Sequence, residues 1–434
     1  MRIERTKILI IFANLLLLTL CLTALAYVIN SGFLGLSLWE ALSILSVPII
    51  IEAPQTLGRA VLLPLLEAYR LLKEKGGSKS PLAAYPKVSV IVPAHNEEEY
   101  IQKALESLLE DTYPNKEIIV VDDGSTDKTY VKAIAFAKDP RVKVVRREVA
   151  SGAKARAVNY GLIFASGDII TVVDGDTIIE RGSLRELVAP MLRDPNVIGV
   201  AGNVKVANRK NLLTRFQAYE YLLSMEMGRR WQGVLGGILV IPGAFGAVRR
   251  DVFESLGRMH PDTITEDFDM TLMLQKVRKK IAFSPRAIAW THVPERWRDW
   301  IRQRRRWASG QAQVYLKHSN IFFRRRFGLL GFLIAPNNVF MDMVALFIRY
   351  LWLAALLTFY VASLSYLLKI LLLVYTFYFA LELTQLASAS LLTPVKKDLE
   401  NAYLAPLMML YRSIHSIVRL TAYMDVLLGK KIRW

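Results

Sequence analysis

Cysteine is almost absent from this 434-residue chain, since Cys21 is its only one. A single thiol excludes an intramolecular disulfide framework and a cysteine metal cluster. Zinc-finger spacing, a basic zipper and an RNA-binding signature are also absent, so the excess of 56 Lys and Arg over 38 Asp and Glu does not indicate nucleic acid. A net charge of +18 then favours an anionic membrane surface or a phosphorylated substrate.

Two apolar blocks, at about residues 8–72 and 327–428, flank a charged middle. Residues 8–29 are apolar for long enough to cross a bilayer, which takes about 20 residues. A cleaved signal peptide is the alternative, because Ala-Leu-Ala at 24–26 resembles a cleavage site. Residues 33–51 predict a second span. Basic residues precede the first span and follow the second, so we expect an integral cell-membrane protein whose middle domain is cytoplasmic.

The C-terminal block predicts two spans, at 339–360 and 364–392, and a third apolar segment at 403–428. Charges inside a span cost about 2.5 to 3.5 kcal/mol each on insertion scales. Arg412 and Arg419 lie on one face of the third segment. They would line a sugar-conducting path if the segment crosses the membrane, or face headgroups if it is an interfacial amphipathic helix.

The changes in composition divide the chain into five parts. Just before the second apolar block, ten Lys or Arg stand against one acid, as expected where a cytoplasmic surface meets lipid headgroups. The predicted parts are an N-terminal membrane region at 1–75 with two spans and an amphipathic segment, a linker at 76–86, a cytoplasmic domain at 87–295, basic interfacial helices at 296–326 and a C-terminal membrane region at 327–434 with two to three spans.

From Lys87 onward, short β-branched runs alternate with helical patterns, which predicts an α/β domain with a largely parallel sheet. Ligands of such sheets bind at the carboxyl ends of the strands. We expect strands at 88–92, 117–121, 142–145, 168–173 and 197–201, and helices at 97–110, 127–138, 152–165 and 181–192.

Polar sequences follow three of these expected strands. Pro-Ala-His-Asn-Glu at 93–97 follows the first, Asp-Asp-Gly-Ser at 122–125 the second, and Asp-Gly-Asp at 174–176 the fourth. Asp-Gly-Asp alone is as often a turn as a metal site, but here its carboxylates emerge from a buried strand. Hard oxygen ligands suit Mg²⁺ or Mn²⁺, which takes its other ligands from water and a diphosphate.

The sequence Gln-Arg-Arg-Arg-Trp at 303–307 lies where the charged middle ends. On a helix, Gln303, Arg306 and Trp307 fall at i, i+3 and i+4, so an amide, a guanidinium and an indole share one face. That face would hold a phosphorylated donor and a stacked sugar. Arg304 and Arg305, off that face, are expected to meet headgroups. A core or interfacial role is the alternative for Trp307.

These motifs recur in a recognisable order: Asp122-Asp123, Lys154, Asp174-Gly175-Asp176, Gly243-Ala244-Phe245, Thr265-Glu266-Asp267 and Gln303 to Trp307. Their order and spacing resemble glycosyltransferase family 2, in particular its processive membrane branch of cellulose, chitin, hyaluronan and poly-N-acetylglucosamine synthases. The resemblance covers about residues 86–316. It implies an α/β GT-A domain accompanied by α-helical transmembrane and interfacial segments.

The resemblance also implies roles for single residues. The nucleotide would be bound by Pro93, Ala94, His95, Glu97, Asp123, Lys154, Asp174 and Arg306. The acceptor would be bound by Gly243, Ala244, Phe245, Gln303 and Trp307, although a plain turn is the alternative for 243–246. Asp123 would read the base, Lys154 would face the diphosphate, and Asp176 with Asp174 would hold Mg²⁺ or Mn²⁺. Ala153 separates Gly152 from Lys154, a departure from the family pattern that puts the role of the glycine in doubt.

Asp267 would be the catalytic base, and its neighbour Glu266 is the alternative. A carboxylate within reach of an attacking hydroxyl contributes roughly 10²- to 10⁴-fold to a rate. Because a helical pattern begins here, capping by Thr265 or Asp267 is the competing structural role. Lys154, Arg306 and the metal would neutralise the departing diphosphate.

The predicted function is inverting, metal-dependent transfer from a UDP-sugar to a growing β-linked polysaccharide, with export through the same chain. One alternative is transfer of a single sugar to a lipid acceptor, such as a polyprenyl phosphate or a glycolipid. Another is a membrane transporter or signalling protein that binds a nucleotide-sugar without turnover. The family's gating-loop signature is not found after Trp307, which weakens the expectation of processivity.

Overall fold

A computed structural model of the chain describes residues 34–74, 85–361 and 363–430, together with Thr19, Thr23 and Tyr27. Apart from Thr19, Thr23 and Tyr27, the predicted span at 8–29 lies outside the described residues, as do its signal-peptide alternative and nearly all of the linker at 76–86. The chain forms two compact units, which we call the helical unit and the sheet unit. The helical unit comprises Met1–Lys79, Leu222–Trp231 and Asn337–Leu420, and the sheet unit comprises Ser80–Tyr221, Gln232–Pro336 and Thr421–Trp434.

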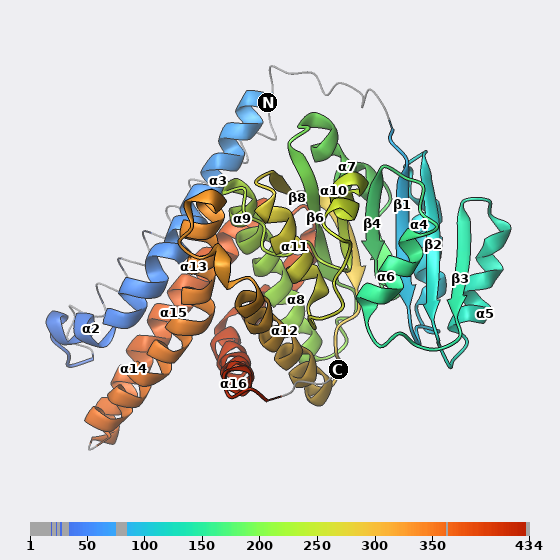
Figure 1. Cartoon of the computed structure of the whole chain (residues 1–434). Coiled ribbons are helices and arrows are strands. Elements are labelled where there is room, and N and C mark those ends of the chain that lie inside the picture. Colours follow the sequence, from blue (N-terminus) through green and yellow to red (C-terminus); the bar gives the residue numbers. More distant parts are fainter. Residues whose placement is uncertain are drawn as a thin grey trace. The chain divides into compact units, whose positions relative to one another are not determined.

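The sheet unit is built on one mixed sheet of eight strands within the described residues (Figure 1). Its spatial order is β3-β2-β1-β4-β7-β6-β8-β5. All five strands expected from the sequence are present. The strands are β1 (Val88–Ala94), β2 (Lys116–Asp123), β3 (Val142–Arg147), β4 (Ile169–Val173), β5 (Ile178–Ile179), β6 (Val197–Val206), β7 (Phe245–Arg249) and β8 (Lys280–Thr291).

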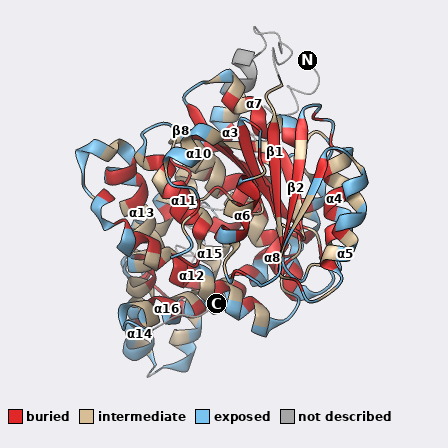
Figure 2. Ribbon diagram, turned by 45° about the vertical axis from the view of Figure 1, so that its right-hand side comes forward, coloured by how far each residue is buried: buried red, intermediate tan, exposed pale blue. Residues whose placement is uncertain are grey.

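Strands β3, β2, β1 and β4 pair in parallel, as the alternating pattern predicts. Strand β7 then runs antiparallel to both β4 and β6, while β6 and β8 are parallel. Val90 and Ile91 point to opposite faces of the sheet, and both are fully buried. This burial on both faces explains the near-continuous apolar sequence of the parallel strands, and β1 and β2 are correspondingly coloured as buried in Figure 2.

Helices cover the sheet on both faces. Helix α6 packs on β1 and β2, and α7 packs on β6 and β8. Gly161 permits the close approach of α6, because a Cβ there would lie 2.7 Å from Ile91 Cγ2 and 2.8 Å from Val121 Cγ2. The main helices of this unit are α4 (Ile101–Glu110), α5 (Thr129–Ile134), α6 (Lys154–Leu162), α7 (Ser183–Arg193), α8 (Leu212–Leu223), α10 (Arg250–Ser255), α11 (Glu266–Lys276) and α12 (Trp297–Lys317).

Three described helices are long and apolar enough to cross a membrane, namely Pro48–Tyr69, Leu330–Tyr360 and Leu364–Leu392. Two of them cover the predicted spans at 339–360 and 364–392. In the helical unit, α3 packs along α15. The main helices of this unit are α2 (Leu38–Ile44), the π-helix η1 (Pro48–Glu52), α3 (Ala53–Glu74), α14 (Ala345–Tyr360), α15 (Leu364–Leu392) and α16 (Met408–Leu427).

The predicted span at 33–51 overlaps only the start of the first of the three apolar helices, which begins at Pro48 and continues through the segment expected to be only amphipathic. Ser37 caps the separate short helix α2, accepting a hydrogen bond from the Glu40 N–H. Pro48 stands in the first turn of its helix, where a missing N–H has no partner to lose. Glu52 pairs with Arg349 at 2.7 Å, which lowers the cost of a charge within this apolar helix.

The arginines of α16 are paired with acids of the same helical unit. Arg412 lies 3.0 Å from Glu382 of α15, and Arg419 lies 3.2 Å from Asp342. Pairing lowers the cost of placing these charges beside apolar helices. In the segment 403–428, which is not among the three helices named above, Arg412 and Arg419 are therefore both neutralised by acids.

Candidate active site

The strand register brings the separate motifs to one edge of the sheet. Ala94 pairs with Asp122, so the carboxyl ends of β1 and β2 are level. Val173, the last residue of β4, pairs with Phe245, the first residue of the antiparallel strand β7. The Gly-Ala-Phe sequence therefore enters the sheet beside the point where Asp-Gly-Asp leaves it. Parallel ordering alone would have placed these two motifs at opposite edges.

Lys154 connects several of the expected site residues. It is the first residue of α6, and Gly152 before it adopts a φ of +73°, at a position where a Cβ would meet nothing within 4 Å. The role of this glycine is thus conformational, since it turns the chain into the helix. Lys154 Nζ forms an ion pair with Asp174 and donates a hydrogen bond of 3.1 Å to the Gly243 carbonyl oxygen. Burial lowers the pKa of Lys154, but Asp174, Glu266 and Asp267 outweigh it and raise that pKa overall.

Gly243 in turn contacts Asp267. The Gly243 N–H donates a hydrogen bond of 3.3 Å to Asp267 Oδ2, and Asp267 Oδ1 accepts one of 2.8 Å from the Phe268 N–H. Asp267 is half-buried, whereas Glu266 is only 7% exposed. Burial and the charge of Asp267 raise the pKa of Glu266 to about 7. Of the two carboxylates, Asp267 is the one whose side chain faces the loop that also meets Lys154.

Helix capping does not account for Thr265. Helix α11 begins at Glu266, and Thr265 occupies the N-cap position without a side-chain capping bond to the described residues. Its Oγ1 atom is buried against α12, because a Cβ on Gly310 would lie 2.5 Å from it. Thr265 therefore contributes to packing of α11 against α12 rather than to the end of its own helix.

Three acids crowd together at the edge of the sheet. A Cβ on Gly175 would lie 3.2 Å from Glu97 Cγ, which places Glu97 against the Asp-Gly-Asp turn. Burial, Asp176 and Asp174 raise the pKa of Glu97 to about 8, and burial and Asp174 raise the pKa of Asp176 to about 6. A divalent cation would relieve this repulsion, and its preferred ligands are carboxylate oxygens. The donor set of Asp174 and Asp176 therefore suits Mg²⁺ or Mn²⁺.

Asp123 is held by Ser151 and Arg147, which were not among the predicted site residues. Its carboxylate accepts hydrogen bonds from the Ser151 N–H at 3.1 Å and from the Ser151 hydroxyl, and it pairs with Arg147 at 3.1 Å. The Asp123 carbonyl oxygen lies 2.9 Å from His95 Nδ1. Ser151 directly precedes the Gly152–Lys154 segment, so its position in the sequence could have indicated a role at the site. No sequence motif indicates Arg147.

The remaining residues of the 93–97 motif differ in exposure. Pro93 is half-buried, Ala94 is buried and His95 is exposed. Asn96, which follows His95, has a φ of +57° and accepts a hydrogen bond of 2.9 Å from the Thr126 N–H on its side-chain oxygen. This turn holds the loop after β1 against the loop after β2, so both loops line the same edge.

The helix that carries 303–307 is α12, which confirms the helical geometry assumed for this motif. Gln303 and Arg306 are half-buried and Trp307 is 37% exposed. Arg306 lies near enough to Glu266 to lower the pKa of that carboxyl, opposing the effect of burial. The Gln303 side-chain oxygen is buried without a hydrogen-bond partner among the described residues.

The prediction that Arg304 meets headgroups is wrong. Its residue is 1% exposed, and Arg304 Nη2 donates a hydrogen bond of 2.8 Å to Glu220 of α8. Arg305 is likewise committed, to Asp425 of the same unit. The helical wheel assigned both residues to the outer face, but α8 and the segment after residue 420 cover α12 there, which no local pattern reveals.

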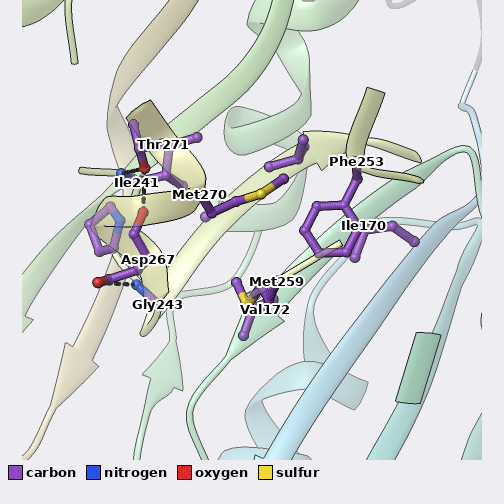
Figure 3. Close-up of a pocket in the computed structure, with 12 residues that line it drawn as sticks. Ile170, Val172, Ile241, Gly243, Phe253, Met259, Asp267, Met270 and Thr271 are labelled. Carbon is purple, nitrogen blue, oxygen red and sulfur yellow. Dashed lines mark hydrogen bonds between the residues drawn. The ribbon is translucent and has the colours of Figure 1, made fainter. Parts of the chain in front are cut away.

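A small apolar cavity of about 30 Å³ lies behind Asp267 and Gly243 (Figure 3). The hydroxyl of Thr271 donates to the Asp267 carbonyl oxygen at 2.6 Å and accepts from the Ile241 N–H at 2.8 Å. The cavity is lined by Ile170, Val172, Ile241, Pro242, Gly243, Gly246, Val248, Phe253, Met259, Asp267, Met270 and Thr271. The polar edge of the site thus rests directly on the core of the sheet unit.

A second acidic group lies apart from these motifs. His260, Asp262 and Asp269 place their potential metal-ligating atoms within 4.8 Å of one another. However, Lys317 Nζ lies 2.9 Å from Asp262 Oδ1 and 2.7 Å from Asp269 Oδ2, and His318 contacts Asp269 as well. The ammonium already neutralises these acids, so the group ties α11 to the end of α12.

Comparisons with known proteins agree with this arrangement. The family model described as Glycosyl transferase family 2 matches residues 89–257. A probable glycosyltransferase YdaM of Bacillus subtilis is 36% identical over 247 residues, covering 55% of this chain and 58% of that protein. A poly-beta-1,6-N-acetyl-D-glucosamine synthase of Staphylococcus epidermidis is 32% identical over 254 residues, covering 57% of this chain and 61% of that protein.

These matches therefore span only about three fifths of the relatives' own lengths. A solved structure with a similar fold is a mannosyltransferase of Pyrobaculum calidifontis in complex with GDP-Man and Mn²⁺, with a TM-score of 0.56, 20% identity, and coverage of 89% of this chain and 100% of that one. The likeness confirms the expected GT-A fold. Residues 89–257 are therefore similar to the domain of glycosyl transferase family 2.

Proposed function

We propose that the protein is a membrane-bound, inverting, metal-dependent glycosyltransferase that uses a UDP-sugar to elongate a β-linked polysaccharide. The observation that carries the proposal is the position of Lys154. Its ammonium pairs with Asp174, bonds the Gly243 carbonyl oxygen and is close enough to Glu266 and Asp267 for their charges to raise its pKa. One cation thus adjoins the proposed metal ligands, the acceptor loop and the proposed base.

The residues around Lys154 supply what a sugar transfer needs. Asp267 would accept the proton of the acceptor hydroxyl while that oxygen forms a bond to the anomeric carbon. The bond from that carbon to the diphosphate breaks, and UDP leaves with the bonding electrons. Attack from the side opposite the leaving group inverts the configuration.

The departing diphosphate needs compensation of its negative charge. Asp176 and Asp174 would hold Mg²⁺ or Mn²⁺, which stabilises negative charge on phosphate oxygens when bound. Lys154 and Arg306 would add two positive charges from the protein itself. Trp307, which is 37% exposed, would stack on a sugar ring of the acceptor.

The donor and the product are proposed from the relatives. The Staphylococcus epidermidis relative is named for poly-beta-1,6-N-acetyl-D-glucosamine synthesis, which supports an N-acetylhexosamine donor and a polymeric product. The three apolar helices support attachment to a membrane, and we place the sheet unit on the cytoplasmic side, where activated sugars are made. Export of the polymer through the same chain belongs to this proposal.

The test uses the full chain purified in detergent and incubated with Mg²⁺ or Mn²⁺, a panel of UDP-sugars, and GDP-mannose. We expect UDP release with one UDP-sugar and a polymeric product when the products are sized. Release of UDP with only one lipid-linked sugar formed would instead support transfer to a lipid acceptor. Binding of a nucleotide-sugar without release of its nucleotide would overturn the proposal and favour a transporter or signalling protein.

A further inference from the structure

Arg304 is a buried cation within the Gln303 to Trp307 motif. Its side chain is 0% exposed, and it lies on α12 four residues after Trp300 and three residues before Trp307. Removing a charged group from water is unfavourable unless other interactions compensate it. Interactions within the protein must therefore compensate the burial of this guanidinium.

The guanidinium of Arg304 lies over the ring of Trp307. Its Cζ atom is 4.3 Å from the centroid of that ring and 5.7 Å from the centroid of the Trp300 ring. Trp300 is fully buried, whereas Trp307 is 37% exposed. One face of the Trp307 indole is thus covered by a cation, and its exposed surface is available to a ligand.

Glu220 of α8 fixes the guanidinium in this place. Arg304 Nη2 donates a hydrogen bond of 2.8 Å to Glu220 Oε2, and the Glu220 side chain is 24% exposed. A planar guanidinium can stack on an indole and bond a carboxylate at its edge at the same time, whereas an ammonium offers no flat surface to stack. The Arg304–Glu220 pair therefore links α8 to the orientation of the Trp307 ring.

We propose that Arg304 and Glu220 are positioning residues that hold the Trp307 indole as a platform for an acceptor sugar. This inference rests on the proposed function, because it names the acceptor site of that transferase. Sugar rings stack on flat aromatic surfaces, and a ring that is fixed before binding loses less conformational freedom on binding. Arg304 and Glu220 act through Trp307 and touch no substrate themselves.

The first test is a double-mutant cycle measured by UDP release from the full chain, with a β-linked N-acetylglucosamine oligosaccharide as acceptor probe. Arg304→Met, which keeps the packed volume, should raise the acceptor KM about tenfold and leave the donor KM unchanged. Trp307→Ala should raise the acceptor KM by at least as much. In the Trp307→Ala background, Arg304→Met should have no further effect. An equal tenfold effect in both backgrounds would overturn the proposal.

The conservative variants separate positioning from folding. Glu220→Gln keeps the shape of the carboxylate and should reproduce a part of the Arg304→Met effect on acceptor KM. Arg304→Lys keeps the charge and the partner but loses the stacked plane, so its acceptor KM should lie between those of wild type and Arg304→Met. A donor KM that rises together with the acceptor KM in both variants would indicate general loss of structure and contradict the proposal.

The second test needs no turnover and so distinguishes failure of this inference from failure of the proposed function. The full chain is labelled with 5-fluorotryptophan, and the Trp307 resonance is assigned by its loss in Trp307→Phe. In wild type the ¹⁹F resonance of Trp307 should be single and narrow. Arg304→Met and Glu220→Gln should shift and broaden it and leave in place the tryptophan resonances other than that of Trp300, whose ring centroid lies 5.7 Å from Arg304 Cζ. An unchanged Trp307 resonance in both variants would overturn the inference, even if UDP is released.

Discussion

The Gly243 N–H donates a hydrogen bond of 3.3 Å to Asp267 Oδ2, so the loop before β7 is joined to the first turn of α11. The carbonyl oxygen of the same glycine accepts a hydrogen bond of 3.1 Å from Lys154 Nζ. One glycine therefore lies between the proposed base and the cation proposed to face the diphosphate. A displacement of this loop would disturb both.

Gly243→Ala should weaken donor binding without unfolding the protein. A Cβ at this position would lie 2.7 Å from Lys154 Nζ, which is the mobile end of a long side chain and can move away. The displaced ammonium would then neutralise the diphosphate less well, so we expect kcat/KM for the donor to fall about tenfold, or roughly 1.4 kcal/mol. Steady-state UDP release measures this loss.

The matched control for this change is Gly228→Ala, because nothing lies within 4 Å of a Cβ at Gly228 and its φ is not in the left-handed region. This variant should keep the kinetic constants of wild type. If Gly243→Ala matches wild type as well, the contact between Gly243 and Lys154 has no role in donor binding.

Asp267→Asn should stop turnover and leave donor binding intact. An amide cannot accept the proton of the acceptor hydroxyl, so kcat should fall roughly 10²- to 10⁴-fold. Glu266→Gln should be milder, because Glu266 is buried at 7% exposure and does not contact Gly243 in the way that Asp267 does. Single-turnover UDP release and equilibrium binding of UDP separate the two effects. A larger loss of kcat in Glu266→Gln than in Asp267→Asn would show that Glu266, and not Asp267, is the catalytic base.

Binding of Mn²⁺ should weaken as the pH falls below about 6. Burial and the charge of Asp174 raise the pKa of Asp176 to about 6, so below that pH the carboxyl holds a proton that competes with the metal. The apparent Kd for Mn²⁺, measured by electron paramagnetic resonance, should therefore rise about tenfold per pH unit below 6 and change little between pH 7 and 7.5. Chelation by EDTA should stop UDP release.

Two variants locate this metal. Asp176→Asn should abolish the tight, pH-dependent binding of Mn²⁺. Asp262→Asn is the control from the second acidic group and should leave it unchanged, because Lys317 already pairs with Asp262 and Asp269. If Asp262→Asn abolishes Mn²⁺ binding and Asp176→Asn leaves it unchanged, the metal binds at the group of His260, Asp262 and Asp269 instead.

Glu117 should stabilise the sheet unit at neutral pH. Burial raises the pKa of this carboxyl, but hydrogen bonds from Ser89, Ser166 and Lys87 outweigh it and lower the pKa to about 2, from 4.5. A lowered pKa gives stability that is complete above pH 4.5 and is lost as the pH falls through 2. Glu117→Gln should therefore reduce the free energy of unfolding by about 2 kcal/mol at pH 7 and by less at pH 3.

Urea unfolding followed by tryptophan fluorescence in detergent checks this difference. Glu106→Gln, at an exposed position of α4, is the control and should change the midpoint little at either pH. A Glu117→Gln effect as large at pH 3 as at pH 7 would show that loss of the charge is not the cause.

Local patterns predicted much of this molecule. β-branched runs placed all five expected strands, because burial on both faces of a parallel sheet demands continuous apolar sequence. The helical spacing of Gln303, Arg306 and Trp307 was read from their separation along the chain, since a helix repeats every 3.6 residues. Two apolar spans were found by length and composition alone, because the thickness of a bilayer sets both.

Other features depend on contacts between residues far apart in the chain. The antiparallel strand β7 brings Gly243 to the same edge of the sheet as Asp174. This placement could not be predicted, because the alternation of apolar residues does not show the direction in which a strand runs. The apolar helix expected at 33–51 instead begins at Pro48 and includes a charged residue, Glu52. The partner that neutralises Glu52 is Arg349, almost 300 residues later.

The sequence by itself determined the resemblance to glycosyltransferase family 2, the parallel part of the sheet and the order of the polar motifs, because these follow from local spacing and from residue chemistry. Only the tertiary structure decided which charged groups meet. It buried Arg304 between Glu220 and Trp307, where the helical spacing alone had placed it at a lipid surface. The spacing of residues along a helix shows which of them share a face. Which face is covered by other parts of the chain depends on the tertiary structure, because the covering elements are far away in the sequence.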